Sequence, residues 1–223
     1  DGAADVPLGR LPVRTAEETS AIVAKLFAYE DGPADDAWTK KAVFVADHTD
    51  GPSDFAARCV TAASALPAGY TVRQLAADLI GAGGVRTELL SELNSGTGLA
   101  VFFGHASQEM WSGSGILFGD DGASLAASPR LPLMVSMTCL TGMYHDLFVE
   151  CMTKKLLRAP GGPVALWGST GFCEPQSQTR MAVGFLARVT GQDHLTFGEA
   201  AVAAKRGITE RDARVTWSLF GDP

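Results

Sequence analysis

The stretch LAVFFGHASQEMW, Leu99 to Trp111, decides the fold class. Its first five residues are apolar, have the length of a strand, and end abruptly at Gly104-His105. A short, wholly apolar strand is typical of a parallel sheet that is covered on both faces. Because ligand chemistry collects at the carboxyl ends of such strands, His105 is a candidate functional residue. A histidine that only occupies a loop is the alternative, and residues elsewhere in the chain must distinguish the two.

The remainder of the chain alternates short apolar runs with segments of helical periodicity. This alternation predicts an α/β fold, a mostly parallel sheet flanked by helices on both faces. We expect a single domain over residues 1–223, with an opening segment and first helix over 1–40 and the core over 41–223. The expected strands cover 42–46, 70–75, 99–103, 133–137 and 164–167, and the expected helices cover 15–29, 54–65, 85–93, 146–158, 178–189 and 197–205.

Composition and charge exclude several classes of partner. The 223 residues are 46% hydrophobic and 19% charged, which is typical of a compact globular protein. The net charge of −7 and the absence of a Lys/Arg block argue against a nucleic-acid partner. No apolar stretch approaches the length of a membrane span. The start of the sequence, DGAAD, is not a signal peptide, and we expect a domain excised from a longer chain.

The four cysteines are Cys59, Cys139, Cys151 and Cys173, and no two of them form a C-x-x-C pair. This spacing predicts neither a disulfide framework nor a zinc site. Most such cysteines are packing residues. Cys139 differs because it follows directly on the apolar run 133–137, so it would lie at the end of a strand.

A cysteine peptidase needs a thiolate, a nearby imidazole and donors for the oxyanion. His105 and Cys139 are 34 positions apart and each follows an apolar strand. If these strands are neighbours in a parallel sheet, both side chains emerge at the same edge. His48, His145 and His194 are alternative partners, and His145 is the most serious because it is only six positions from Cys139.

The segments around both residues resemble the gingipain family of cysteine peptidases, and further matches follow in order along the chain. The matching segments are GRLPV (9–13), LAVFFGH (99–105), TCLTG (138–142), ALWGST (165–170) and TWSLFGDP (216–223). The resemblance implies a caspase-like fold with Cys139 as nucleophile and His105 as general acid/base. It also implies that the backbone N–H groups of Cys139 and Ala106 hold the oxyanion. Ala106 stands where the family has glycine. This substitution would weaken the Ala106 N–H as an oxyanion donor only if the position required a positive φ, which alanine rarely adopts.

The loop after the first expected strand carries the acids that the resemblance assigns to substrate and histidine. Ser53-Asp54 is similar to the family's Ser-Asp pair, so Asp54 would bind a basic side chain at P1, the substrate residue before the cleaved bond. The alternative is that Asp54 caps the helix that follows. An acid in this loop orients the histidine in the family; we assign Asp47, although the register leaves Asp50 open.

Three further residues are expected to line the substrate site by resemblance: Trp111, Ser169 and Thr170. For Trp111, a packing aromatic is the alternative. After Thr170 the family has a tryptophan that covers the pocket, whereas this sequence has GFCEP over 171–175. That difference leaves the choice between Arg and Lys open.

The sequence thus predicts a cysteine endopeptidase that cleaves protein or peptide substrates after basic residues through an acyl-enzyme. Two alternatives remain: an inactive gingipain-like domain that serves as an interaction module, and an intracellular caspase-like protease activated by a partner. Both alternatives are compatible with flanking domains or a regulatory partner. The resemblance favours a secreted or cell-surface location, with an intracellular one as the alternative.

No cofactor is required for this chemistry, and we assign no metal ligands. Calcium is common in the gingipain family, and Asp120-Asp121 lie adjacent in an expected turn. Adjacent acids in a loop are able to bind a structural Ca²⁺, although a turn alone also explains this pair, and we assign neither residue as a ligand.

Overall fold

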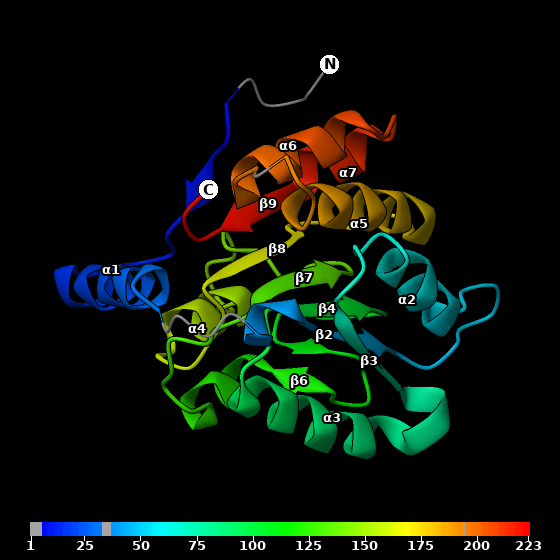
Figure 1. Cartoon of the computed structure of the whole chain (residues 1–223), viewed down its shortest axis with the longest axis horizontal. Helices are drawn as coiled ribbons and strands as arrows, with labels where there is room; N and C mark the ends of the chain where they lie inside the picture. Colours follow the sequence, from blue (N-terminus) through cyan, green and yellow to red (C-terminus); the bar gives the residue numbers. More distant parts are fainter. Residues whose placement is uncertain (1–5, 33–36, 194) are drawn as a thin grey trace.

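A computed structural model of the chain describes residues 6–32, 37–193 and 195–223, and places a seven-stranded sheet at its centre (Figure 1). The strands of this sheet are β1 (Gly9–Arg10), β2 (Lys41–Ala46), β3 (Thr71–Ala76), β4 (Leu99–Phe103), β7 (Leu133–Met137), β8 (Ala165–Ser169) and β9 (Trp217–Phe220). Their order is β1-β9-β8-β7-β4-β2-β3, and every neighbouring pair is parallel except β8 and β9. The prediction of a mostly parallel α/β sheet is confirmed.

Helices cover both faces of the sheet (Figure 1). They are α1 (Ala16–Glu30), α2 (Phe55–Ala63), α3 (Ala77–Ser95), α4 (Met152–Arg158), α5 (Pro175–Val189), α6 (Phe197–Arg206) and α7 (Arg211–Thr216). Two 3-10 helices, Ala37–Lys40 and Gly119–Ser124, and a small hairpin of β5 (Met110–Trp111) and β6 (Leu117–Phe118) complete the fold. One hydrophobic core joins the sheet to α2, α5 and α6, and a second joins it to α3, α4 and the hairpin.

Two of the predicted helices differ from the observed ones. The helix expected over 146–158 begins only at Met152, because the Asp146 carboxylate accepts the N–H groups of Phe148 (2.7 Å) and Val149 (2.9 Å) and closes a turn. The helix expected over 85–93 is longer: α3 starts at Ala77, and its one non-helical residue is Gly81, with φ 70° and ψ 157°. The predicted break at 81–84 is therefore confined to one residue.

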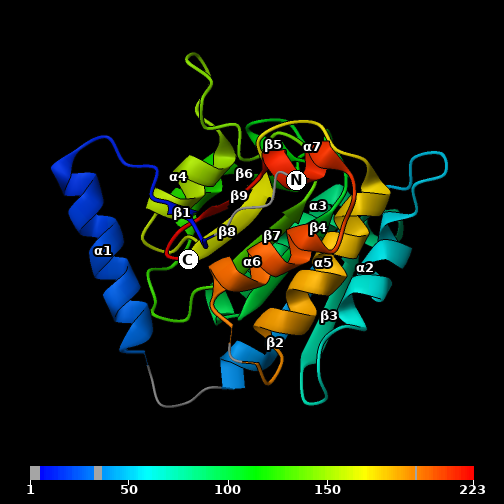
Figure 2. The same cartoon turned by 90° about the horizontal axis from the view of Figure 1, so that it is seen from above.

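The sheet also has an edge that the sequence analysis missed. β9 pairs antiparallel with β8, and β1 adds to β9 in the register Gly9↔Leu219 and Arg10↔Phe220. Segments from the two ends of the described chain therefore lie side by side, which Figure 2 shows from above.

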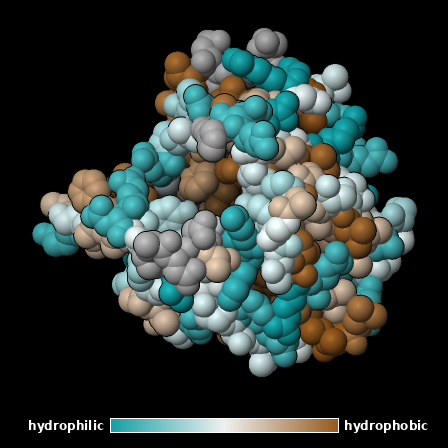
Figure 3. Space-filling model, in the orientation of Figure 1, coloured by the Kyte–Doolittle hydropathy of each residue, from teal (hydrophilic) through white to brown (hydrophobic). Residues whose placement is uncertain are grey.

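The surface is mixed in character. On the face drawn in Figure 3, polar side chains separate the hydrophobic ones into small spots. Among the described residues, no helix has both the length and the apolar character needed to cross a membrane.

Candidate active site

His105 and Cys139 follow two neighbouring strands of the sheet. β4 and β7 pair in parallel, with Phe103 opposite Met137. His105 comes two residues after Phe103, and Cys139 comes two residues after Met137. Both residues thus leave the sheet at the same level of its carboxyl edge, as the sequence predicts for a pair that works together.

The backbone at His105 is held by a buried carboxylate. Asp47, at the end of β2, accepts the N–H of His105 (3.1 Å), the N–H of His48 (2.8 Å) and the Ser112 hydroxyl (2.7 Å). Gly104 makes this approach possible, because a Cβ at that position would lie 2.4 Å from the Cβ of Asp47. Asp47 therefore fixes where the histidine loop runs.

The imidazole itself contacts a different acid. His105 Nε2 lies 2.9 Å from Asp50 Oδ2, and the edge of the ring packs on Phe55 with centroids 5.4 Å apart. The side chains of His105 and Asp50 are 61% and 70% exposed. The carboxylate that contacts the His105 ring is thus that of Asp50, the alternative that the sequence left open. Asp47, the residue predicted to orient the ring, instead accepts the backbone N–H of His105.

A tight turn carries Cys139. The N–H of Thr141 donates to the Cys139 carbonyl (2.8 Å), and Leu140 between them has φ 63°. This is a γ-turn of the rare kind that needs a positive φ at its centre. A non-glycine residue in that region stores strain, and such strain gathers at functional sites. The Leu140 N–H is fixed to the Gly171 carbonyl (3.2 Å), so the turn is anchored beside β8.

The expected oxyanion donors are compatible with the backbone. Among the described residues, the non-glycine residues with positive φ are Ser112 and Leu140, so Ala106 carries its methyl group without left-handed strain. Within that same part of the chain, neither the N–H of Ala106 nor that of Cys139 has a hydrogen-bond partner. Both donors remain available to a ligand.

A cavity of about 680 Å³ opens beside Cys139. It lies between the loop that precedes α5 and the start of α7, and the residues around it are Cys139, Phe172–Pro175, Ser177 and Glu210–Ala213. Three of these are acids (Glu174, Glu210 and Asp212) and one is basic (Arg211). Glu210 already pairs with Arg180 outside the cavity (2.9 Å). The cavity is therefore acidic on balance.

Asp54 does not line this cavity. It is exposed and caps α2, with its Oδ1 accepting the Ala57 N–H at 2.8 Å. The capping alternative thus describes what Asp54 does in the structure.

Trp111 is a packing residue. It is completely buried, stacks on Phe102 with centroids 4.6 Å apart, and donates its indole N–H to the Ser136 hydroxyl (3.2 Å). A side chain without exposed surface cannot contact substrate, so the expected substrate contact is wrong.

Ser169 and Thr170 shape the loop before α5. The buried Ser169 hydroxyl bonds to the N–H (3.1 Å) and the carbonyl (2.9 Å) of Gly171. Thr170 donates both its N–H and its hydroxyl to the Thr216 carbonyl, at 2.9 and 3.0 Å. Neither residue lines the cavity at Cys139, and their predicted contact with substrate is not part of this geometry.

The other histidines have local contacts. His48 Nδ1 lies 3.0 Å from Asp78, and the His145 ring packs edge-on against Tyr144. His194 lies outside the described residues. Like His105, neither His48 nor His145 lines the cavity at Cys139, and what distinguishes His105 is that it follows the strand that pairs with β7.

The two acids named for calcium have partners within the protein. Arg86 forms a bidentate pair with Asp121 (2.6 and 2.5 Å), and Lys155 binds Asp120 (2.9 Å). In the part of the chain that the structure describes, no group of three or more His, Cys, Asp or Glu residues is placed to hold a metal ion.

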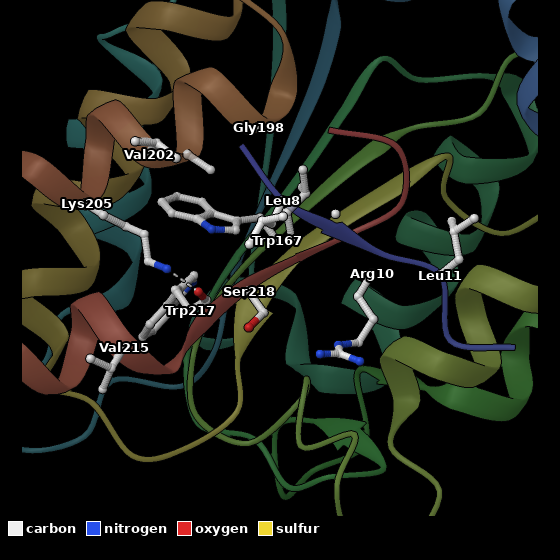
Figure 4. Close-up of a pocket in the computed structure, with 13 residues that line it drawn as sticks. Leu8, Arg10, Leu11, Trp167, Gly198, Val202, Lys205, Val215, Trp217 and Ser218 are labelled. Atoms are coloured by element: carbon white, nitrogen blue, oxygen red, sulfur yellow. Dashed lines mark hydrogen bonds between the residues drawn. The ribbon is translucent and has the colours of Figure 1, made fainter. Parts of the chain in front are cut away.

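A second cavity, of about 470 Å³, lies between β1, β9 and α6 (Figure 4). Trp167 and Trp217 line it, and Lys205 reaches across to the Trp217 carbonyl. Burial lowers the pKa of Lys205. None of the residues predicted for catalysis lines this cavity, so the chemistry expected of Cys139 belongs to the first one.

Comparison with known proteins gives a family for the chain and solved structures with the same fold. The model of peptidase family C25 matches residues 1–223. No curated protein sequence matches the chain.

Solved structures with the same fold include the Arg-specific cysteine proteinase gingipain R. That structure matches all of the present chain with TM-score 0.86 and 22% identity, and a complex of pro- and mature gingipain domains from Porphyromonas gingivalis matches all of it with TM-score 0.86 and 23% identity. A structure described as a protease matches 94% of the chain with TM-score 0.73 and 17% identity. The chain spans 56%, 57% and 53% of these three, about half of each. At these identities the likeness shows the fold, which is the caspase-like fold of gingipain.

Proposed function

Because the chain belongs to peptidase family C25, the gingipain family of cysteine peptidases, we propose that it hydrolyses peptide bonds with Cys139 as nucleophile and His105 as general acid/base. The observation that carries this proposal is the position of both residues, two residues beyond paired positions on neighbouring parallel strands. Protein or peptide chains are the proposed substrates.

The hydrogen bond at His105 suggests which ring atom does the chemistry. When Nε2 donates to Asp50, Nδ1 carries the lone pair that accepts the proton of the Cys139 thiol. The carboxylate then stabilises the imidazolium that forms. The thiolate attacks the substrate carbonyl, and the N–H groups of Cys139 and Ala106 donate to the oxyanion. The imidazolium returns its proton to the leaving amine, and water later hydrolyses the acyl-enzyme.

We further propose cleavage after Arg or Lys. The cavity beside Cys139 is acidic on balance, and a carboxylate in a confined site favours a guanidinium or ammonium over neutral side chains. Glu174 and Asp212 line this cavity and are candidate selectors, together with Asp54, which the family resemblance assigns to this role.

Fluorogenic peptides with Arg, Lys, Asp or Ala at P1 test both proposals. We expect the wild type to cleave the Arg and Lys peptides, and Cys139→Ala and His105→Ala to lose at least about 10²-fold in kcat/KM. Equal background turnover in all three proteins would reject the peptidase and leave the inactive interaction module as the function.

The selector is tested separately, with Asp212→Asn and Asp54→Asn as a matched pair of substitutions. The variant that loses its preference for basic P1 residues identifies the acid. An unchanged preference in both would exclude these two residues as selectors.

A further inference from the structure

A second cysteine lies next to the proposed nucleophile. Cys139 Sγ is 3.8 Å from the carbonyl oxygen of Cys173, and both residues line the same cavity. They are 34 positions apart in sequence and come from different segments, one after β7 and the other between β8 and α5. The fold therefore brings the Cys139 sulfur against the backbone of Cys173, and both residues line one cavity although they are far apart in sequence.

These two cysteines are also the accessible ones among the four. Cys139 and Cys173 are half-buried and open to the cavity, whereas Cys59 and Cys151 are fully buried in the hydrophobic cores. Burial, with the neighbouring Cys139 as the next cause, raises the pKa of Cys173 to about 12, so this side chain is a neutral thiol at physiological pH. Cys139, the proposed nucleophile, is therefore the thiol of this cavity that we expect a peroxide to oxidise first.

Few backbone hydrogen bonds hold the loop around Cys173. Among the described residues, the N–H groups of Phe172, Cys173 and Glu174 have no backbone partner, and the Phe172 side chain is 76% exposed. The Cys173 carbonyl is held by the Gln178 amide (3.2 Å), which keeps the residue near Cys139. A disulfide needs the two sulfurs at about 2 Å with a defined dihedral angle, so closure requires a small shift of this loop.

We propose that Cys139 and Cys173 are a reversible oxidation site, in which a hydroperoxide links them as a disulfide. The Cys139 thiolate first attacks the peroxide, which gives a sulfenic acid on Cys139 and an alcohol or water. The Cys173 sulfur then attacks the sulfenic sulfur, and the displaced hydroxide leaves as water with the Cys173 proton. Two thiols are oxidised and one peroxide is reduced. Because the disulfide blocks the sulfur of the proposed nucleophile, it abolishes peptidase activity. This loss of activity rests on the proposed function.

The bond is tested by mass spectrometry on the wild-type protein treated with hydrogen peroxide. We expect a loss of two hydrogen masses from the intact protein, and a peptide map that joins the segments of Cys139 and Cys173. Cys173→Ala should show no such bond and should gain oxygen on Cys139 instead, because a sulfenic acid without a second thiol oxidises further. Cys151→Ala is the matched control and should form the bond as the wild type does.

Activity gives a second readout, normalised to the untreated sample of each variant. After peroxide and then a thiol reductant, the wild type and Cys151→Ala should regain most of their activity, whereas Cys173→Ala should stay inactive. A peptide map without the Cys139–Cys173 link, or full recovery of Cys173→Ala, overturns the proposal. If the untreated protein has no peptidase activity, the proposed function fails while the map still decides the disulfide.

Discussion

Asp47 and Asp50 have different roles at His105. Asp47 is buried and accepts hydrogen bonds from the backbone of His105 and from Ser112, so it determines the path of the loop. Asp50 is exposed, and its side chain contacts the His105 ring. The effects of removing each carboxylate should therefore separate into stability and chemistry.

We expect Asp47→Ala to lower the free energy of unfolding, because it leaves the buried Ser112 hydroxyl and the backbone N–H groups of His48 and His105 without their acceptor. Each such group costs about 1–3 kcal/mol. Asp50→Asn should leave the free energy of unfolding nearly unchanged and lower kcat, because the His105 ring loses the carboxylate that orients it. Urea unfolding and peptide turnover measure the two effects.

The opposite pattern, a stable Asp47→Ala with altered turnover and a destabilised Asp50→Asn, would contradict this division. Asp31→Asn is a control, because this acid lies at the end of α1 and lines neither cavity.

Single residues were the least predictable part of the site from sequence. The motif predicts an acid in the loop after β2, and both Asp47 and Asp50 fit it. Which of the two contacts the His105 ring depends on how the loop folds, and the fold of the loop depends on contacts with Gly104 and Ser112. Trp111 is similar: its burial is determined by the stack on Phe102, which a linear sequence does not display. That His105 and Cys139 lie at the same edge of the sheet was predictable, because each comes shortly after a short, mostly apolar run of strand length.

At the level of elements, a buried lysine joins α1 to the end of α4. Lys25 Nζ donates to the carbonyls of Leu157, Ala159 (3.2 Å) and Pro163 (3.0 Å). An ammonium group suits a helix C-terminus, where carbonyls lack partners. Burial nevertheless lowers the pKa of Lys25 from 10.5 to about 8.

This shift predicts how stability depends on pH. Between pH 8 and 10.5 the unfolded chain holds a proton on Lys25 that the folded chain has released, so the free energy of unfolding rises with pH in this window. The contribution is about 1.4 kcal/mol per pH unit for a single group. Urea unfolding of the wild type and Lys25→Met from pH 7 to 10.5 measures it.

We expect the stability of the wild type relative to Lys25→Met to increase over that window. A constant difference would show that Lys25 keeps its ordinary pKa. Lys155→Met is a useful control, because the pKa of Lys155 is raised by its pair with Asp120. The stability of the wild type relative to Lys155→Met should therefore not increase between pH 8 and 10.5.

The β5–β6 hairpin gives a second prediction at this scale. Trp111→Phe keeps an aromatic ring on Phe102 but leaves the buried Ser136 hydroxyl without its donor. We expect a loss of about 1–3 kcal/mol in the free energy of unfolding and an unchanged preference at P1. A changed P1 profile in a fully folded variant would restore Trp111 as a substrate contact.

Helices and strands were predictable where the pattern of apolar residues alone indicates them. The apolar runs 42–46, 99–103 and 133–137 became β2, β4 and β7 with shifts of at most one residue. The helix expected from 146 was too long because the Asp146 side chain competes for backbone donors, a local effect that periodicity does not register. β9 was missed because its pairing depends on β8, far away in sequence.

At the scale of the whole molecule, one segment projects from the body. Figure 2 shows it in yellow-green between β7 and α4, rising at the top of the view. Within this segment Leu147 and Phe148 are 90% and 95% exposed, and the neighbouring Asp146 carboxylate accepts a hydrogen bond from the Gln108 amide (2.9 Å). An exposed segment that projects from the surface is a typical site of first proteolytic attack.

Brief digestion with chymotrypsin should therefore cut first after Phe148 and give fragments 1–148 and 149–223. Phe148→Ser with Leu147→Ser should slow this cut strongly, and Phe172→Ser is the matched control, as its side chain is 76% exposed in another loop. First cleavage elsewhere, read by mass spectrometry of the fragments, would show that this segment is protected in solution.

The pairing of β1 with β9 has a consequence for how the protein is made. On the ribosome β1 is synthesised before any other strand of the sheet, yet its neighbour β9 is synthesised after all of them. The loop next to Cys139 depends on the same late segment, since Thr170 is fixed to Thr216. A nascent chain thus cannot complete the surroundings of Cys139 until the segment that carries Thr216 and β9 has left the ribosome.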